Sequence, residues 1–372
     1  MQILYDHQMF AIQKFGGISR IFIELMRELS VNSICRINWY RGWHQDDYEL
    51  SDFSQHLGRY WTFSRKLLPL KNYDKINRLT FQVFMLTAGK QYDIYHPTYY
   101  DASLLSLVKP KKLVITVHDM ILEKFLGNIE RFESVREGKK ELIEKSDLIF
   151  VPSDNTKKDL IDILQVDAAK IKTTYWGTRI GEINPSPLPK ICAQKPYFLY
   201  VGTRSKYKEF DKLIQAFAQN NWLSTNFNVV CFGGTSNFTA PEIERMEKAK
   251  LRDNFIYLSG DDSHLKTLYQ NAQALVYTSG YEGFGLPTLE AMECKCPVIC
   301  CPTSSLPEVV GDAAIFFTPD SIEELVNSMK IVVEEREKRA SMLAKGEERA
   351  KLFSWEKTAK LTFAAYQAVL DK

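Results

Sequence analysis

The residues best suited to chemistry lie in one short segment, 279–290 (SGYEGFGLPTLE), which follows an apolar stretch and opens an expected helix. Pro287 suits the first position of a helix, where its missing N–H costs nothing. Glu290 can accept two hydrogen bonds from a cis-diol such as a ribose, and Glu282 can hold sugar hydroxyls or offset positive charge at a reacting carbon. Outward-facing amides at the positive end of this helix suit a phosphate, and they belong to Phe284, Gly285 and Leu286. An ordinary helix start with acidic neighbours would show the same pattern.

A second segment, 201–208 (VGTRSKYK), places two cations after an expected strand. Arg204 and Lys208 would lie beyond the carboxyl end of that strand. Two fixed cations there can stabilise the negative charge that develops on a leaving nucleotide diphosphate, as a metal ion would. A solvated basic loop is the alternative interpretation of the same residues.

Two further motifs follow expected strands in the first half of the chain. Gly16 and Gly17 (FGGISR, 15–20) enter a helix and let the backbone approach phosphate or sugar closely. They do not form a G-x-G-x-x-G fingerprint, and a plain turn explains them equally well. His118 ends a strand (TVHD, 116–119) and is a candidate hydrogen-bond donor or acid/base group. Single histidines are more often structural, and this applies to His96 as well.

Short apolar strands alternate with amphipathic helices along the whole chain, which predicts α/β layering with parallel sheets. We expect strands at 3–5, 34–39, 94–95, 113–117, 148–151, 172–175, 197–201, 228–232, 255–258, 274–277, 298–300 and 314–317. We expect helices at 19–29, 136–145, 211–219, 264–272, from 287, at 322–335 and at 354–370. Four prolines mark 184–196 as a linker between two domains, 1–190 and 191–353. Ligands of such sheets sit beyond the carboxyl ends of the strands, here in an expected cleft.

The length, net charge and cysteine count agree with this two-domain organisation and exclude several classes of protein. A chain of 372 residues fits two domains, and a net charge of +2 gives no reason to expect nucleic acid as partner. No run of about 18 apolar residues and no signal peptide is seen, which predicts a cytoplasmic protein. The odd count of seven cysteines argues against a disulfide framework. Four crowded cysteines are interpreted as small apolar core residues and not as a zinc site, namely Cys294, Cys296, Cys300 and Cys301.

These motifs together resemble the family-4 retaining glycosyltransferases with the GT-B fold. The resemblance covers nearly the whole chain, and it is carried by 8–10 with 16–20, 281–290 (E-x7-E), 304–314 (SSLPEVVGDAA) and 353–356. It implies two Rossmann-like doubly wound domains that face each other across a cleft. The first binds the acceptor and is joined by the final helix, 354–372, and the second binds the donor. It also implies transfer from a UDP- or GDP-sugar with retained anomeric configuration and without a bound metal or other cofactor.

The resemblance implies a role for each matching position. Gly16 and Gly17 would border the donor's phosphate and sugar, and His118 would face the transferred sugar near the reacting centre. Arg204 and Lys208 would hold the diphosphate. Three further contacts are implied for the second domain: Glu282 with the sugar, the amides of Phe284 to Leu286 with phosphate and sugar, and Glu290 with the ribose.

Two positions depart from the family pattern. Family members usually carry Asn or Gly where this chain has Glu209, which puts an acid beside the cations expected to hold the diphosphate. The family also favours Gly where this chain has Lys295. We therefore expect weaker donor binding from the first departure and a reshaped loop from the second.

Residues 59–90 hold seven Lys or Arg and one acid, Asp74, with aromatic and aliphatic residues between them. A basic, aromatic surface of this kind can dock on anionic lipid. The hypothesis is a lipid-linked glycan acceptor, with the protein peripheral at the inner face of a membrane. A solvated basic helix pair is the alternative.

Asp261 and Asp262 form no D-x-D metal motif after an early strand, and Asp262 or Ser263 is expected to cap a helix.

Three other functions compete with the glycosyltransferase interpretation. The first is a sugar-nucleotide epimerase or phosphorylase on a similar scaffold. The second is a non-catalytic nucleotide-sugar or glycan-binding module, against which the intact set of candidate residues argues. The third, a dehydrogenase, lacks the glycine fingerprint and the acidic residue about 20 positions beyond it.

Overall fold

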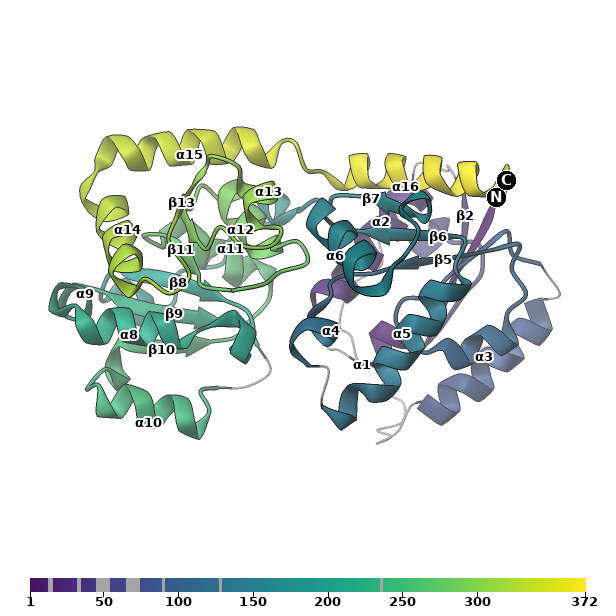
Figure 1. Ribbon diagram of the computed structural model, residues 1–372, viewed down its shortest axis with the longest axis horizontal. Coiled ribbons are helices and arrows are strands. Elements are labelled where there is room, and N and C mark those ends of the chain that lie inside the picture. Colours follow the sequence, from purple (N-terminus) through teal and green to yellow (C-terminus); the bar gives the residue numbers. More distant parts are fainter. Residues whose placement is uncertain are drawn as a thin grey trace. The chain divides into compact units, whose positions relative to one another are not determined.

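The computed structural model describes residues 1–12, 16–31, 35–44, 54–64, 74–88, 91–126, 129–234 and 237–372. The chain divides into two compact units: unit 1 comprises Met1–Trp176 with Trp355–Lys372, and unit 2 comprises Gly177–Ser354 (Figure 1). Each unit contains one parallel sheet with helices packed against it, which confirms the predicted α/β layering. Strands such as β6 and β8 are buried along their whole length, as expected for parallel strands covered on both faces.

The sheet of unit 1 has seven strands in the order β3-β2-β1-β4-β5-β6-β7. Their bounds are β1 (Gln2–Tyr5), β2 (Arg36–His44), β3 (Tyr60–Ser64), β4 (Ile94–His96), β5 (Lys112–Thr116), β6 (Leu148–Val151) and β7 (Ile171–Thr173). The chain winds outward from β1 to β3 and then returns to place β4 on the other side of β1. The connections after β1 and β4 therefore leave in opposite directions, which opens a crevice at the carboxyl edge.

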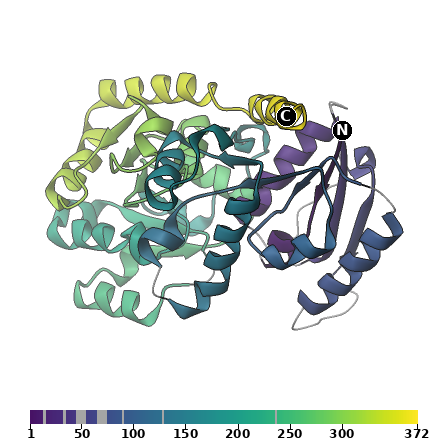
Figure 2. The ribbon, with the colours of Figure 1, turned by 45° about the vertical axis from the view of Figure 1, so that its right-hand side comes forward.

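The helices of unit 1 are α1 (Gln8–Ile12), α2 (Gly17–Val31), α3 (Asp74–Ala88), α4 (Ile121–Phe125), α5 (Glu133–Lys145), α6 (Asp154–Leu164) and α16 (Trp355–Leu370), with the 3-10 turn η2 (Ala102–Leu107). The final helix α16 packs on α2, and Figures 1 and 2 show it beside the chain's first strand. Tyr366 of α16 is fully buried and shares a 2.8 Å hydrogen bond with the hydroxyl of Tyr5. Its oxygen also lies 2.6 Å from Nδ1 of His96. His96 is therefore a structural histidine that ties β4 to the last helix.

Among the described residues of 59–90, Tyr60–Ser64 form strand β3 and Asp74–Ala88 form helix α3, which differs from the alternative of a helix pair. Phe81 and Phe84 are buried and pack against Tyr40, so these two rings form no lipid-facing surface. Residues 65–73 and 89–90, including Leu67 and Leu68, lie outside the described residues. Docking of this region on anionic lipid stays a prediction. Within the described part of the chain, no helix combines the length and apolar character needed to cross a bilayer.

The sheet of unit 2 has six strands in the order β10-β9-β8-β11-β12-β13. Their bounds are β8 (Tyr197–Val201), β9 (Asn228–Phe232), β10 (Phe255–Leu258), β11 (Leu275–Tyr277), β12 (Val298–Cys300) and β13 (Ala314–Phe316). The helices are α7 (Lys190–Ala193), α8 (Asp211–Gln219), α9 (Asn221–Asn226), α10 (Ala240–Lys248), α11 (Asp262–Asn271), α12 (Leu286–Glu293), α13 (Leu306–Val310), α14 (Ile322–Glu334) and α15 (Arg336–Ala350). The strand order reverses between β8 and β11. The long helix α15 was not among the predicted elements.

The structure divides the chain after Trp176, before the proline-rich segment that sequence analysis took as the linker. The reason is a set of side-chain bonds from α11 to the backbone of 181–186. Lys266 Nζ donates to the carbonyls of Gly181 and Ile183, both at 2.6 Å. Thr267 Oγ1 donates to the Ser186 carbonyl at 2.5 Å. These bonds join the prolines and their neighbours to unit 2.

Two details of unit 2 concern its four crowded cysteines and the N-cap of helix α11. The crowded Cys294, Cys296, Cys300 and Cys301 are buried with free thiols, as predicted for core residues. Burial raises the pKa of the Cys296 thiol to about 12. The predicted cap of α11 was wrong by one position, because Asp261 and not Asp262 or Ser263 is the N-cap. Its Oδ1 accepts from the amides of Ser263 at 3.0 Å and His264 at 3.1 Å.

Replacing Tyr366 with Phe is expected to destabilise unit 1 by about 1–3 kcal/mol, because the Tyr5 hydroxyl and His96 Nδ1 each lose a buried hydrogen-bond partner. Equilibrium denaturation of the whole chain measures the effect. Gln367→Ala, on the exposed face of the same helix, is the control and should change stability by less than about 0.5 kcal/mol. Equal stability of Tyr366→Phe and wild type would contradict this role.

Candidate functional site

The predicted residues of unit 2 meet at the carboxyl edge of its sheet, where the strand order reverses between β8 and β11. The connection after β8 contains Lys208, and the connection after β11 leads through 278–285 into α12. The amide of Gly280 donates to the Tyr207 carbonyl at 2.9 Å. Thr278 Oγ1 donates to the Lys208 carbonyl at 2.8 Å. Two segments far apart in sequence thus form one surface at the place where open α/β sheets bind ligands.

A buried ion pair joins these two connections. The ammonium of Lys208 contacts the carboxylate of Glu282, and their side chains are only 12% and 10% exposed. The hydroxyl of Tyr277 donates to Glu282 Oε1 at 2.8 Å and lies 3.2 Å from Lys208 Nζ. Burial, together with the nearby Glu282 charge, raises the pKa of Tyr277, so its hydroxyl stays protonated. The sequence pattern indicates Tyr277 only as a strand end, because its hydrogen-bond partner Glu282 lies on the following loop.

The turn before α12 is held in place by its own backbone conformation and by two serines. The amide of Glu282 donates to Ser304 Oγ at 2.8 Å, and Ser305 Oγ donates to the Glu282 carbonyl at 3.0 Å. Gly285 has φ +94°, which a side chain would strain, and a Cβ there would lie 2.7 Å from Leu306. The helix begins at Leu286, so the amides of 284–286 lie at its N-terminus as predicted.

Glu290 lies on α12 and is 4% exposed. Its Oε2 accepts a hydrogen bond from the hydroxyl of Tyr269 on α11 at 3.1 Å. This bond orients the carboxylate from a neighbouring helix, and sequence analysis did not anticipate it. The expected contact of Glu290 with a ribose stays a prediction.

Arg204 has different neighbours from Lys208. Its Nε lies 3.0 Å from Glu242 Oε1, and its Nη2 donates to the Asn237 carbonyl at 2.9 Å. The guanidinium also lies over the rings of Phe238 and Tyr257, at 5.1 and 5.5 Å from their centroids. In this conformation the arginine braces the start of α10. Its predicted contact with a diphosphate would require it to share or exchange these partners.

Both departures from the family pattern occupy left-handed backbone positions. Glu209 has φ +52° and Lys295 has φ +57°, a region that Gly and Asn adopt at least cost. The carboxylate of Glu209 pairs with Lys212 of α8. Lys295 forms a surface pair with Glu347 at 3.3 Å. The left-handed backbone is strained at both residues. The expected reshaping of the Lys295 loop and the expected effect of Glu209 on donor binding both stay predictions.

In unit 1, His118 lies just beyond β5 and is 4% exposed. Its ring is surrounded by Phe22 and Trp176, each with a centroid separation of 5.8 Å. Neither imidazole nitrogen has a hydrogen-bond partner among the described residues. Burial and the nearby Lys139 cation lower the pKa of His118 to about 3. His118 is therefore neutral at physiological pH and can donate or accept one hydrogen bond at each nitrogen.

Lys139 is a buried cation that holds the backbone next to His118. Its ammonium donates to the Asp119 carbonyl at 2.8 Å and to Glu123 Oε2 at 2.9 Å. The Lys139 and Glu123 side chains are 1% and 8% exposed. The sequence pattern does not indicate this pair, because a lysine in an amphipathic helix normally points to solvent.

The glycine pair opens α2, whose first residue is Gly17. The amide of Arg20 donates to the Gly16 carbonyl at 3.1 Å, which closes the first turn. A Cβ built on Gly17 would meet no atom of the described residues within 4 Å. The expected contact of this helix start with phosphate or sugar stays a prediction.

Acidification is expected to destabilise the protein through its two buried histidines, His96 and His118, whose pKa values are both lowered to about 3. The unfolded chain takes up a proton on each below about pH 6.5, whereas the folded chain does not until about pH 3. Each histidine therefore contributes a loss of about 1.4 kcal/mol per pH unit in that window, and none above it. Denaturation at pH 7, 6 and 5 should show a shallower pH dependence for His118→Gln than for wild type. His56→Gln, at an exposed position, is the control, and identical pH dependences for all three proteins would refute the assignment.

Comparison with known proteins shows which families and folds this chain resembles. The model of Glycosyltransferase Family 4 matches residues 15–180, and the model of Glycosyl transferases group 1 matches residues 189–349. The O-antigen chain mannosyltransferase B of Escherichia coli is 27% identical over 369 residues, covering 94% of this chain and 96% of that protein. Sucrose-phosphate synthase of Thermosynechococcus elongatus superposes with a TM-score of 0.76 at 20% identity, covering 100% and 99% of the two chains. Anabaena Alr3699/HepE in complex with UDP-glucose gives 0.73 at 17% identity, covering 99% of each. With both halves matched and the fold shared, this chain belongs to the family-4 glycosyltransferases, and its two α/β units have the GT-B fold.

Proposed function

We propose that the protein is a retaining glycosyltransferase that moves a sugar from a UDP- or GDP-sugar to a glycan or lipid-linked glycan during surface polysaccharide assembly. The observation that carries the proposal is the meeting of Lys208, Glu282 and the N-terminus of α12 at the strand-order reversal of unit 2. Two relatives support the substrate classes: Alr3699/HepE binds UDP-glucose, and the Escherichia coli relative is an O-antigen mannosyltransferase.

The arrangement offers the donor a complementary group for each of its parts. The amides at the start of α12 suit a phosphate, and Gly285 supplies the left-handed backbone conformation of the turn that leads into this helix. Lys208 supplies positive charge in a poorly solvated place, where it stabilises an anion more strongly than in water. Glu290 lies on the same helix and is oriented by Tyr269, and its carboxylate would accept hydrogen bonds from ribose hydroxyls.

The proposed reaction breaks the bond between the sugar's anomeric carbon and the phosphate oxygen. A bond from the acceptor oxygen to the same carbon forms on the same face, and the acceptor proton passes to the leaving phosphate. Glu282 would offset positive charge on the sugar as the first bond breaks. His118, held neutral by burial, would hydrogen-bond the transferred sugar and not act as a cation. Lys208, Arg204 and the helix amides take the place that a metal ion has in other transferases.

A thermal-shift panel of UDP, GDP, ADP and their common sugar conjugates tests the donor site. A nucleotide at 100 times its dissociation constant should stabilise the protein by about 2.7 kcal/mol. Glu290→Gln should weaken the preferred nucleotide by tenfold or more, because hydrogen bonds to a charged group contribute about 1.5–3 kcal/mol. Glu323→Gln, an exposed acid in the first turn of α14, is the matched control and should leave the shift unchanged. If no nucleotide stabilises the protein, the proposal fails and a glycan-binding module becomes the better interpretation.

Turnover in excess chelator is expected to equal turnover without it, because fixed protein cations neutralise the leaving diphosphate. The reaction is followed with the nucleotide sugar identified by the panel, and the product's anomeric proton is examined by NMR. The configuration should be that of the donor. Activity that is lost in chelator and restored by magnesium or manganese would contradict metal independence, and an inverted product would contradict retention.

A further inference from the structure

Helix α5 carries one lysine whose surroundings differ from those of its neighbours. The side chain of Lys139 is 1% exposed, whereas Lys140 and Lys145 on the same helix are 68% and 57% exposed. A buried ammonium loses its hydration, and this loss is costly unless protein groups replace the water. The partners of Lys139 therefore show what its burial serves.

All three partners of the Lys139 ammonium lie in the segment that follows β5. Its Nζ donates to the Asp119 carbonyl at 2.8 Å and to Glu123 Oε2 at 2.9 Å. A weaker contact goes to Met120 Sδ at 3.5 Å. An ammonium has three N–H donors, so Lys139 directs its full capacity at the loop that begins with His118.

The backbone is held on both sides of His118. Its amide donates to Tyr100 Oη at 3.2 Å, and the Tyr100 hydroxyl donates to the Thr116 carbonyl at 3.3 Å. The next carbonyl along the chain, that of Asp119, is held by Lys139. The Lys139 ammonium also lies 5.6 Å from the centroid of the Tyr100 ring. Tyr100 and Lys139 thus form one support around His118.

Tyr100 has anchors of its own, which do not involve Lys139. The buried carboxylate of Asp6, which follows β1, accepts at Oδ1 from Thr98 Oγ1 at 2.7 Å and from the Thr98 amide at 3.0 Å. Gln8 Nε2 donates to Asp6 Oδ2 at 2.7 Å, and Gln8 Oε1 accepts from the Asp101 amide at 2.7 Å. The backbone is therefore fixed on either side of Tyr100, and the support at Asp119 depends on Lys139.

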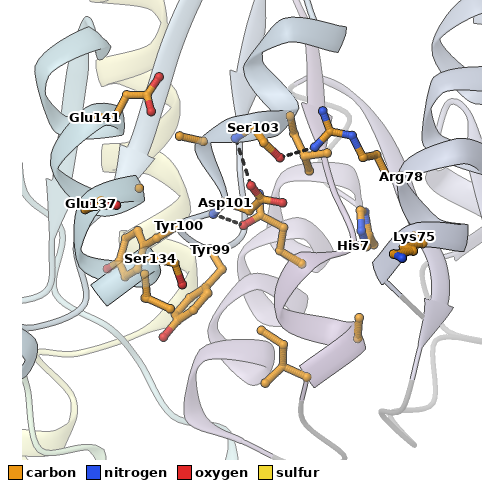
Figure 3. Close-up of a pocket in the computed structure, with 17 residues that line it drawn as sticks. His7, Lys75, Arg78, Tyr99, Tyr100, Asp101, Ser103, Ser134, Glu137 and Glu141 are labelled. Carbon is orange, nitrogen blue, oxygen red and sulfur yellow. Dashed lines mark hydrogen bonds between the residues drawn. The ribbon is translucent and has the colours of Figure 1, made fainter. Parts of the chain in front are cut away.

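Helix α5 is itself pressed against the Tyr100 segment. A Cβ on Gly138 would lie 2.1 Å from the Tyr100 carbonyl, so no larger residue fits there. Figure 3 shows Tyr100 beside the part of α5 that carries Glu137; both line a pocket of about 530 Å³ with Tyr99, between the connections after β1 and β4. This close contact fixes the backbone from which the Lys139 side chain extends.

The imidazole of His118 depends on these backbone anchors. Neither of its nitrogens has a hydrogen-bond partner among the described residues. Its printed neighbours are aromatic rings, which restrict the imidazole less than directed hydrogen bonds do. Burial and the Lys139 cation lower the pKa of His118 to about 3, so the imidazole is neutral. The direction in which its nitrogens point is then set by the peptide groups on either side.

We propose that Lys139 is a positioning residue for the transfer: its ammonium fixes the Asp119 carbonyl and so holds the His118 imidazole in place for the transferred sugar. The inference rests on the proposed transferase function and extends it to a residue outside the predicted donor contacts. Lys139 acts through His118 and takes no part in bond breaking.

Steady-state kinetics test the role. Lys139→Met combined with Glu123→Gln removes both charges at similar side-chain volume, which usually leaves a fold intact. In this paired variant kcat should fall at least about tenfold and the donor KM should stay within about threefold, because the geometry at the reacting carbon changes while the nucleotide contacts do not. Lys140→Met, at the exposed neighbour on α5, is the control and should keep the wild-type kcat.

A mutant cycle with His118 separates positioning from a purely structural role. In a His118→Ala background the paired change should lower kcat by no more than about twofold further, because no imidazole is left to position. Lys139→Gln, which removes the charge alone, is a second variant for the same cycle. The role is overturned if the folded variants keep the wild-type kcat, or if their losses multiply with the loss caused by His118→Ala.

Nucleotide stabilisation of the same proteins separates this inference from the proposed function. UDP or GDP should stabilise the paired variant as much as wild type, because Lys139 lies in unit 1 and the predicted phosphate and ribose contacts lie in unit 2. If nucleotides stabilise the protein but the losses multiply, Lys139 is structural and the transferase function stands. If no nucleotide stabilises the wild type, the proposed function fails and the positioning role fails with it.

Discussion

The reversal of strand order in each parallel sheet is the constraint on which the rest of this structure depends. Neighbouring strands β8 and β11, like β1 and β4, send their connections in opposite directions, and such a reversal at the carboxyl edge is where open α/β sheets bind ligands. Backbone groups there are not used by the sheet and are available to a ligand. Both the candidate donor residues and the pocket of unit 1 lie at these edges, because the topology leaves polar groups accessible there.

Buried charges then determine how these edges are organised. Lys208 and Glu282 in unit 2, Lys139 and Glu123 in unit 1, and Asp6 with its hydrogen-bond donors are all shielded from water. A buried charge costs free energy unless its partners are well placed, so each cluster permits few arrangements of the loops that carry it. The same desolvation keeps His118 neutral. The free-energy cost of burying these charges is offset by their ion pairs and hydrogen bonds. As a result, the loops that carry them have a fixed geometry before any ligand binds.

The local backbone conformation is unusual at the two residues that depart from the family pattern. Glu209 and Lys295 occupy left-handed positions that glycine or asparagine fills at lower cost, and each side chain finds an ion-pair partner nearby. Arg204 is occupied by Glu242 and by aromatic faces at the start of α10. The predicted contact of Arg204 with a diphosphate would therefore require it to share or exchange these partners.

The sequence alone determined most strands, the parallel α/β class and the start of helix α12 in the candidate site, because strand periodicity and glycine or proline at helix starts are local signals. Strand β3 and helix α15 were not predicted from the sequence. Strand β3 lies in a basic stretch without regular alternation of polar and apolar residues, and α15 has few apolar residues. The sequence also carries no indication of four residues whose roles depend on a hydrogen-bond or ion-pair partner far along the chain or on a neighbouring loop, namely Tyr277, Tyr269, Ser304 and Lys139. Only the tertiary structure decided those partnerships, the pocket at Tyr99 and the burial of Phe81 and Phe84. The physical reason is that hydrogen bonding, desolvation and cavity shape depend on distances in space that separation along the chain does not encode.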